Sequence, residues 1–370
     1  MENIVLFGTG SKAEQFYIEF NTKVNIIMCL DNRPNKDYFH GIKICEPNKE
    51  NVSLGYVVVA SSFYLEISEQ LISYGLNEFD DFNCSDCYNK KISVLHGNCH
   101  MDVVKQYLKS SQEFDKVYGF YPNPLIQNNK QGYIKENILN HCDLFIHQDI
   151  RTNNAYGYKL SDEYILGKLP EKAIKITMPN LFGLGYGFFP QYFINDHNPS
   201  LNDDKNGMFP NGDININKFI KAGLNISDII YKINSNEIYS QVEVIDNFES
   251  SIHKIKEREK NWDIKILDFI LYSYKKYKLF YDVGHPTNII MKEISKQILI
   301  NLGLNYNDIK SDLCMNQHED PVYPCVGKYL NLDWVENEII RVNSPKKMNS
   351  NVMDIIEYIK QYIMWCYDYY

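Results

Sequence analysis

The sequence predicts an α/β protein with two parallel sheets in two domains, over residues 1–88 and 89–370. Short apolar runs alternate with amphipathic stretches of helical periodicity, and glycines or small polar residues follow the ends of the runs. This alternation stops near residue 88 and begins again at residue 92. A chain of 370 residues is also long enough to bury two cores.

The first domain is expected to contain three β-α steps around a small parallel sheet. We expect strands over residues 4–7, 24–30 and 56–60, and helices over residues 12–21 and 64–74. The polar, turn-rich stretch over residues 83–91 is the expected boundary.

The turn after the first strand has the outline of a nucleotide-binding turn. Gly8 and Gly10 precede a predicted helix, and Asp31 follows about twenty residues later at the end of the second strand. Glycines let a phosphate approach the backbone, and an acidic side chain can bind a ribose hydroxyl. These residues predict a Rossmann-like domain for a nucleotide or nucleotide-linked sugar. The alternative is a structural role, because any tight strand-to-helix turn favours glycine.

The second domain repeats the pattern around a larger, doubly wound sheet. We expect strands over residues 92–95, 142–146 and 173–178, and helices over 101–110, from about 214 to 259, and over 288–302. Residues 181–213 read as a long irregular insertion, a kind of loop that is often functional.

Two short motifs in this domain predict a nucleophile and a base. Cys99 follows the first strand directly after Gly97 and Asn98, where its thiol would be exposed at the carboxyl edge of the sheet. Asp282 precedes His285 by three residues, a spacing that allows the carboxylate to orient the imidazole ring. The alternative for His285 is a structural histidine before a proline turn.

Composition excludes several classes of function. The formal charge of −9 argues against a nucleic-acid partner, and no apolar run approaches the roughly 18 residues of a membrane-spanning helix. Nine scattered cysteines without an apparent secretory leader predict reduced thiols and a cytoplasmic protein. Cys84 and Cys87 form a single pair rather than the two pairs of a structural zinc site, so no metal is expected.

From about residue 92 to residue 334 the sequence resembles the WcbI-type polysaccharide biosynthesis family of acetyltransferases, whose fold is similar to that of SGNH hydrolases. The resemblance rests on motifs that occur in the family's order: Gly97-Asn98-Cys99, His147-Gln148-Asp149-Ile150-Arg151, Met178-Pro179-Asn180-Leu181-Phe182, Gly185-Tyr186, Phe189-Pro190-Gln191, Arg258-Glu259, His285-Pro286-Thr287-Asn288 and Pro321-Val322-Tyr323-Pro324. One departure is Gly284, which stands where the family usually has asparagine.

The resemblance implies a role for each matching residue. Cys99 takes the place of the SGNH serine, Asn98 contributes to an oxyanion hole, His285 is the base and Asp282 orients it. Coenzyme A or acetyl-CoA would be bound by Gly97, His100, Gln148 and Arg151, with Arg151 on a phosphate, while Asn180 and Tyr186 line the acyl or pantetheine channel.

The predicted function is therefore coenzyme A-dependent transfer of an acyl group, acetyl in the simplest case, to a sugar hydroxyl of a capsular or other surface polysaccharide. The partners would be a small-molecule acyl donor and a carbohydrate acceptor. Two alternatives stay open: an esterase or thioesterase that uses the same residues, and a non-catalytic protein that binds coenzyme A or a nucleotide-sugar. The sequence does not predict the acceptor sugar or the oligomeric state, and a homo-oligomer is one option.

Overall fold

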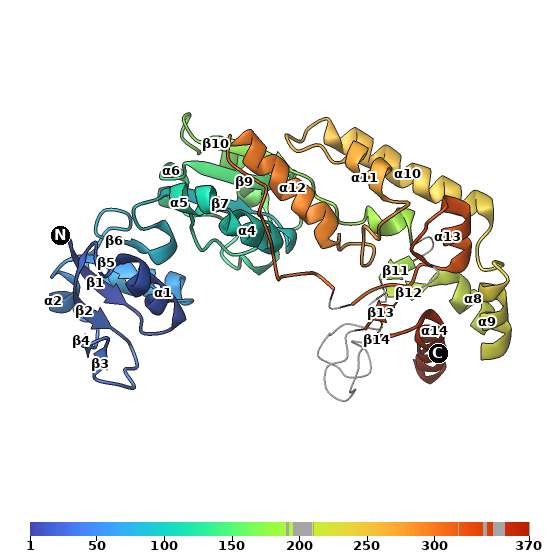
Figure 1. Cartoon of the computed structure of the whole chain (residues 1–370), viewed down its shortest axis with the longest axis horizontal. Coiled ribbons are helices and arrows are strands. Elements are labelled where there is room, and N and C mark those ends of the chain that lie inside the picture. Colours follow the sequence, from blue (N-terminus) through green and yellow to red (C-terminus); the bar gives the residue numbers. More distant parts are fainter. Residues whose placement is uncertain are drawn as a thin grey trace. The chain divides into compact units, whose positions relative to one another are not determined.

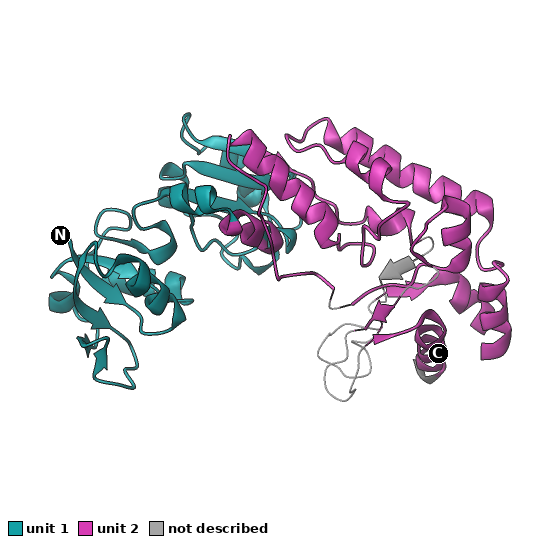
Figure 2. Cartoon of the chain, viewed as in Figure 1, with its two compact units in different colours: residues 1–101, 111–176 teal, residues 102–110, 177–370 magenta. Residues whose placement is uncertain are grey.

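The computed structural model describes residues 1–189, 192–194, 209, 211–316, 318–335, 339–342 and 352–369, and Figure 1 shows the chain. The chain divides into two compact units, which Figure 2 colours separately. The first unit comprises residues 1–101 and 111–176, and the second comprises residues 102–110 and 177–370. The predicted α/β fold class is confirmed, because both large sheets of the structure contain parallel strands.

The first sheet has six strands in the order β3-β4-β2-β1-β5-β6. All neighbouring strands pair in parallel except β3 and β4, which form an antiparallel hairpin. Without β3, this is the strand order of dinucleotide-binding sheets, in which the chain reverses its direction of growth between β1 and β5. The strands are β1 (Asn3–Phe7), β2 (Asn25–Leu30), β3 (Tyr38–Phe39), β4 (Ile42–Cys45), β5 (Tyr56–Val59) and β6 (Phe82–Cys84).

Alternation along β1 builds a core on each face of this sheet. Ile4 and Leu6 share one apolar cluster with Phe16 of α1 (Ser11–Phe20), while Val5 and Phe7 join a second cluster that includes residues of α3 (Tyr64–Ser73). Successive side chains of a strand point to opposite faces, so a strand covered by helices on both sides is apolar throughout. A short helix, α2 (Lys49–Val52), and a 3-10 turn, η1 (Ser85–Cys87), complete this region.

The second sheet has four strands in the order β10-β9-β7-β8. β7 (Lys91–His96) pairs in parallel with β8 (Tyr118–Phe120) and β9 (Leu144–Gln148), and β10 (Ile174–Met178) lies at the edge. The chain thus runs from the centre to one edge and then to the other, which is a doubly wound order with its switch point between β7 and β9. The helical elements that connect these strands are α4 (His100–Ser110), α5 (Gln112–Val117), η2 (Ile126–Asn128), α6 (Glu136–Asn140), η3 (Tyr158–Leu160) and α7 (Asp162–Leu166).

The rest of the chain is mainly helical. Its helices are α8 (Ile214–Lys221), α9 (Ile226–Asn234), α10 (Gln241–Glu259), α11 (Leu267–Ser273), α12 (Asn288–Asn301), α13 (Pro324–Leu330) and α14 (Ile355–Tyr369). Two antiparallel pairs accompany them, β11 (Tyr192–Ile194) with β12 (Asn211–Asp213) and β13 (Ile340–Arg341) with β14 (Val352–Met353). α10 begins with a capping box in which Ser240 and Glu243 satisfy each other's backbone N–H groups. No helix within the described residues is long and apolar enough to cross a membrane.

Several element predictions differ from the structure. The strand expected over residues 142–146 lies two residues later, and the expected polar boundary over 83–91 begins with residues of the buried strand β6. The expected irregular insertion contains η4 (Gly185–Gly187), β11 and β12, and its residues 190, 191, 195–208 and 210 lie outside the described residues, among them Pro190 and Gln191.

Candidate functional site

The turn after β7 is held by the side chain of Gln148, which stands at the end of β9. The Oε1 atom of Gln148 accepts a hydrogen bond from the backbone N–H of Asn98 at 2.9 Å, and its Nε2 atom lies 3.2 Å from Nδ1 of His100. Gly97 permits this approach, since a Cβ atom there would lie 2.6 Å from Oε1 of Gln148. Because the turn follows β7 and contacts the end of β9, it lies at the switch point of the sheet, where ligands bind in doubly wound folds.

Cys99 lies within this turn, immediately before α4. Its side chain is half-buried, and the thiol is not part of a disulfide. The Oδ1 atom of Asn98 accepts a hydrogen bond from the backbone N–H of His100 at 3.0 Å. Because the N–H of Asn98 is already bonded to Gln148, an oxyanion bound at this turn would use other donors. None of the nine cysteines, all within the described residues, forms a disulfide.

Arg151 follows β9 by three residues and is exposed. Its backbone carbonyl accepts a hydrogen bond from Asn154, while no ion pair of its guanidinium is found in the part of the chain that the structure describes. An exposed guanidinium near the carboxyl end of a parallel strand is suited to bind a phosphate.

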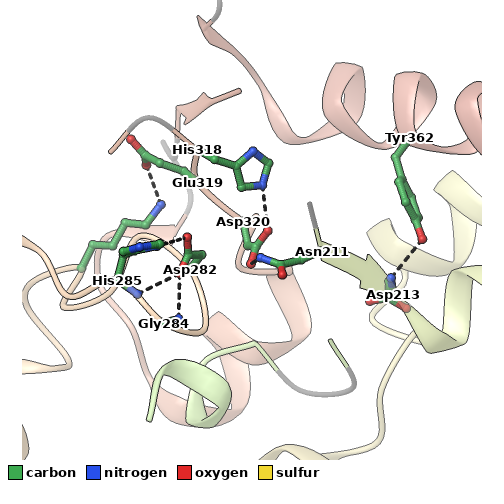
Figure 3. Close-up of polar contacts among 10 residues, drawn as sticks. Asn211, Asp213, Asp282, Gly284, His285, His318, Glu319, Asp320 and Tyr362 are labelled. Carbon is green, nitrogen blue, oxygen red and sulfur yellow. Dashed lines mark hydrogen bonds and ion pairs between the residues drawn. The ribbon is translucent and has the colours of Figure 1, made fainter. Parts of the chain in front are cut away.

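The loop with Asp282 and His285 lies in the second unit and forms a closed hydrogen-bonded turn (Figure 3). Oδ2 of Asp282 lies 2.7 Å from Nδ1 of His285, and Oδ1 accepts hydrogen bonds from the N–H groups of Gly284 and His285 at 2.7 and 2.8 Å. Asp282 is only 5% exposed, whereas the imidazole of His285 is 37% exposed. With Nδ1 held by the carboxylate, Nε2 is the nitrogen through which the ring would exchange a proton.

The charge state of Asp282 follows from opposing effects. Burial raises the pKa of this carboxyl. The hydrogen bond and charge of His285, together with the Gly284 N–H, lower the pKa by more than burial raises it. The pKa of Asp282 is thus below its ordinary value, and the group is a carboxylate that can stabilise an imidazolium ion.

Tyr186 is carried next to this loop by the turn η4. The N–H of Gly185 donates to the carbonyl of Val283 at 3.2 Å, and a Cβ atom at position 185 would lie 2.4 Å from the carbonyl oxygen of Asp282. Burial, and then the charge of Asp320, raise the pKa of Tyr186, so its hydroxyl stays protonated and can donate a hydrogen bond.

Asn180 and Gly284 are linked through Phe182. The Oδ1 atom of Asn180 accepts a hydrogen bond from the N–H of Phe182 at 3.2 Å, and a Cβ atom at position 284 would lie 2.8 Å from the ring of Phe182. The lack of a side chain at position 284 therefore accommodates the close approach of this ring.

A second His–Asp pair in this region was missed by the sequence interpretation. Nε2 of His318 lies 3.0 Å from Oδ1 of Asp320, and Oδ2 of Asp320 accepts a hydrogen bond from Asn211 at 2.8 Å (Figure 3). The signal was present in the sequence, because a histidine and two acidic residues directly precede the Pro321-Val322-Tyr323-Pro324 motif. Among the described residues no group of three His, Cys, Asp or Glu side chains is arranged to hold a metal ion.

The first sheet has a cavity of about 600 Å³ at its own switch point. Gly8, Gly10 and Asp31 all line it, together with residues that follow β5. Gly8 has a φ of +121°, and a Cβ atom there would lie 2.5 Å from the carbonyl oxygen of Ala60. The hydroxyl of Thr9 donates to Oδ2 of Asp31 at 2.6 Å. The three residues that the sequence grouped are thus brought together.

The sequence-predicted site residues therefore fall into three groups. The first sheet brings together the glycine turn and Asp31, the second sheet brings together the Cys99 turn and Gln148, and the second unit brings together Asp282, His285 and Tyr186.

Comparisons with known proteins give matches to both parts of the chain. Residues 92–307 match the model of a family described as the polysaccharide biosynthesis enzyme WcbI, and residues 1–79 match a model described as C2185-like, N-terminal. No curated protein matches the sequence.

One solved structure is similar, with a TM-score of 0.63 and 17% sequence identity, over 75% of this chain and 90% of the other. It is described as native WcbI, a polysaccharide biosynthesis enzyme, without a disulfide bond between coenzyme A and one of its cysteines. At this identity the likeness shows the fold.

Proposed function

Because this chain belongs to the family of the polysaccharide biosynthesis enzyme WcbI, we propose that it transfers an acyl group, acetyl in the simplest case, from coenzyme A to a sugar hydroxyl. The acceptor would be part of a capsular or other surface polysaccharide or its precursor. The observation that carries the proposal is the pair of Asp282 and His285, whose 2.7 Å contact is the geometry of an oriented general base.

Coenzyme A is assigned to the turn after β7. The similar WcbI structure is described in terms of coenzyme A and a cysteine, and in this chain Cys99 lies at the switch point of the sheet. Arg151 would bind a phosphate of the donor, while Gly97, His100 and Gln148 would shape the turn that receives it. Asn180 and Tyr186 would line the acyl or pantetheine channel.

The chemistry can proceed by two routes. In the direct route, Nε2 of His285 takes the proton of the sugar hydroxyl, the sugar oxygen forms an ester bond with the acyl carbon, and the carbon–sulfur bond of the thioester breaks. The imidazolium then returns its proton to the leaving thiolate. In the covalent route, the thiolate of Cys99 attacks the acyl carbon, the bond from this carbon to the sulfur of coenzyme A breaks, and coenzyme A leaves as its thiolate. The sugar hydroxyl then gives its proton to His285 and attacks the new thioester, whose carbon–sulfur bond breaks to release the Cys99 thiolate, and the imidazolium returns the proton to a released thiolate.

The same residues could instead perform hydrolysis, with water in place of the sugar. An esterase or thioesterase would consume acetyl-CoA at the same rate with or without a carbohydrate acceptor. A protein that only binds coenzyme A or a nucleotide-sugar would consume none. The half-exposed imidazole of His285 favours a catalytic role over a purely structural one.

The decisive assay measures release of the coenzyme A thiol from acetyl-CoA with and without a panel of sugars and nucleotide-sugars. We expect release that depends on the acceptor and falls roughly 100-fold or more in His285→Asn, because general-base catalysis contributes a factor of this order. His253→Asn, at an exposed histidine of α10, is the matched control. Unchanged release in His285→Asn would overturn the proposal.

Cys99→Ala separates the two routes. Loss of turnover, together with an acylated wild-type protein in mass spectra, would support the covalent route, and full activity would leave the direct route. Cys45→Ala, another half-buried cysteine without a disulfide, is the matched control.

We also propose that the cavity of the first sheet binds a nucleotide or nucleotide-linked sugar. Its support is the position of the cavity at the switch point, the glycine turn that precedes α1, and the placement of Asp31 at the end of β2 for a ribose hydroxyl. Titration calorimetry with uridine diphosphate and with NAD should show binding that Asp31→Ala weakens about tenfold or more. Binding of neither compound, or binding that Asp31→Ala leaves intact, would count against this assignment.

A further inference from the structure

The loop that carries His285 is a small antiparallel hairpin. Phe280 and Pro286 form an isolated β-bridge, and the backbone N–H of Tyr281 donates to the carbonyl of His285 at 2.8 Å. The N–H of Thr287 donates to the carbonyl of Leu279 at 2.8 Å. These bonds fix the hairpin locally, and its position in the second unit depends on what packs against it.

The segment of His318, Glu319 and Asp320 packs against this hairpin. The N–H of Asp320 donates to the carbonyl of Tyr281 at 2.8 Å, directly before Asp282 in the chain. Glu319 forms an ion pair with Lys278 at 2.8 Å, and both side chains are largely buried, with exposures of 11% and 17%. Figure 3 shows the two His–Asp pairs on neighbouring segments.

The carboxyl of Asp320 is fully buried, and both of its oxygens are hydrogen-bonded. Burial and the negative charge of Asp282 raise the pKa of this carboxyl above its ordinary value, whereas the hydrogen bonds from His318 and Asn211 and the charge of His318 oppose this rise and favour the carboxylate. The two carboxylates are thus close enough to act on each other. A negative charge at Asp320 also favours the protonated form of His285, which lies on the other side of Asp282.

The tautomer of His318 follows from burial. Its Nδ1 atom is buried and has no hydrogen-bond partner among the described residues, whereas Nε2 faces Asp320. A buried N–H without an acceptor is costly, so the proton of His318 that is hydrogen-bonded is the one on Nε2, which faces Asp320. This hydrogen bond favours the carboxylate form of Asp320.

We propose that His318 and Asp320 are positioning residues for the proposed base, in that they hold the hairpin of His285 and place a second negative charge behind Asp282. This inference rests on the proposed function for the role of His285 as a base. Further titratable groups around the hairpin are Lys278 and Glu319 at its start, Tyr281 within it, Tyr186 on η4, and Cys314. Tyr186 and Tyr281 are neutral because their pKa values are raised, and Lys278 and Glu319 neutralise each other.

The test is an NMR titration of the imidazole of His285 in the full chain, with its signal assigned through His285→Asn. Asp320→Asn keeps the shape of the side chain but removes its charge, and we expect it to lower the pKa of His285 by about one pH unit. Asp213→Asn, which removes another buried carboxyl of the second unit, is the matched control and is expected to leave this titration unchanged.

Two substitutions of His318 keep the test decisive if Asp320→Asn does not fold. His318→Gln retains a donor at the position of Nε2 and should titrate like the wild type. His318→Leu removes the donor, so Asp320 takes up a proton and the pKa of His285 should fall, as in Asp320→Asn.

An unchanged His285 titration in Asp320→Asn and in His318→Leu would overturn the proposal. The titration needs neither an acyl donor nor an acceptor. A shifted titration in a protein without acyl transfer would therefore support the pairing of the two dyads while the proposed function fails.

Discussion

At the scale of single residues, the buried carboxyl of Asp213 stabilises the start of one helix, while its burial destabilises its charged form. Its Oδ1 atom accepts hydrogen bonds from the N–H groups of Asn215 and Ile216 at 2.8 and 2.9 Å and so caps α8. Oδ2 accepts hydrogen bonds from the hydroxyls of Tyr239 and Tyr323. Burial raises the pKa of Asp213 to about 6, and these hydrogen bonds only partly compensate.

This raised pKa predicts a pH dependence of stability. The folded state binds the proton of Asp213 more tightly than the unfolded chain, where the pKa is about 3.9, so the group's contribution to the free energy of unfolding falls as pH rises from about 4 to about 6. Asn at this position keeps the cap and removes the titration. We expect Asp213→Asn to gain stability relative to the wild type over this range, by up to about 3 kcal/mol.

Urea unfolding of both proteins at several pH values between 4 and 7.5 would measure this difference. Asp312→Asn, at an exposed carboxyl, provides the control. Stability curves of the wild type and Asp213→Asn that run parallel across the range would contradict the prediction.

At the scale of elements, apolar periodicity located β1, β2 and β5 of the first sheet and β7, β9 and β10 of the second, because buried faces repeat with the period of the backbone. It did not locate the shorter strands β3, β4, β6 and β8. It failed where polar residues are buried. His147 and Gln148 belong to β9 and are only 2% and 1% exposed, yet two polar residues in a row predict that the strand has already ended. Asp162 and the Cys99 turn satisfy these polar groups, and such partners are visible only in three dimensions.

The turn after β7 gives a prediction for one element. An alanine at position 97 would force Gln148 to move, since its Oε1 atom would lie 2.6 Å from the new Cβ. We expect Gly97→Ala to lose about 1–3 kcal/mol of stability and to weaken coenzyme A binding, because the hydrogen bond from the N–H of Asn98 to Oε1 of Gln148 is lost.

Gly167→Ala is the matched control for this substitution, since its Cβ would come no closer than 3.4 Å to its nearest neighbour. Chemical unfolding and ligand titration of both variants would test the prediction. Equal stability and equal affinity in Gly97→Ala and Gly167→Ala would contradict it.

At the scale of the whole molecule, the sequence grouped the candidate residues by motif, and the structure distributes them over the compact units. Cys99 and Gln148 belong to the first unit, whereas Asp282 and His285 belong to the second. Sequence spacing identified the Asp282–His285 contact because it is local. It could not identify the pairing of Asn211 with Asp320, which joins residues 109 positions apart.

The central claim is that the chain binds an acyl donor built on coenzyme A, and calorimetric titration with coenzyme A and acetyl-CoA tests it most directly. Arg151→Ala should weaken the binding about tenfold or more, since a charge-assisted contact to a phosphate is lost. Lys172→Ala, which removes another exposed cation of the first unit, should bind like the wild type. Binding of neither ligand to the wild-type protein would contradict the claim and leave hydrolysis of another ester as the better account of the Asp282–His285 pair.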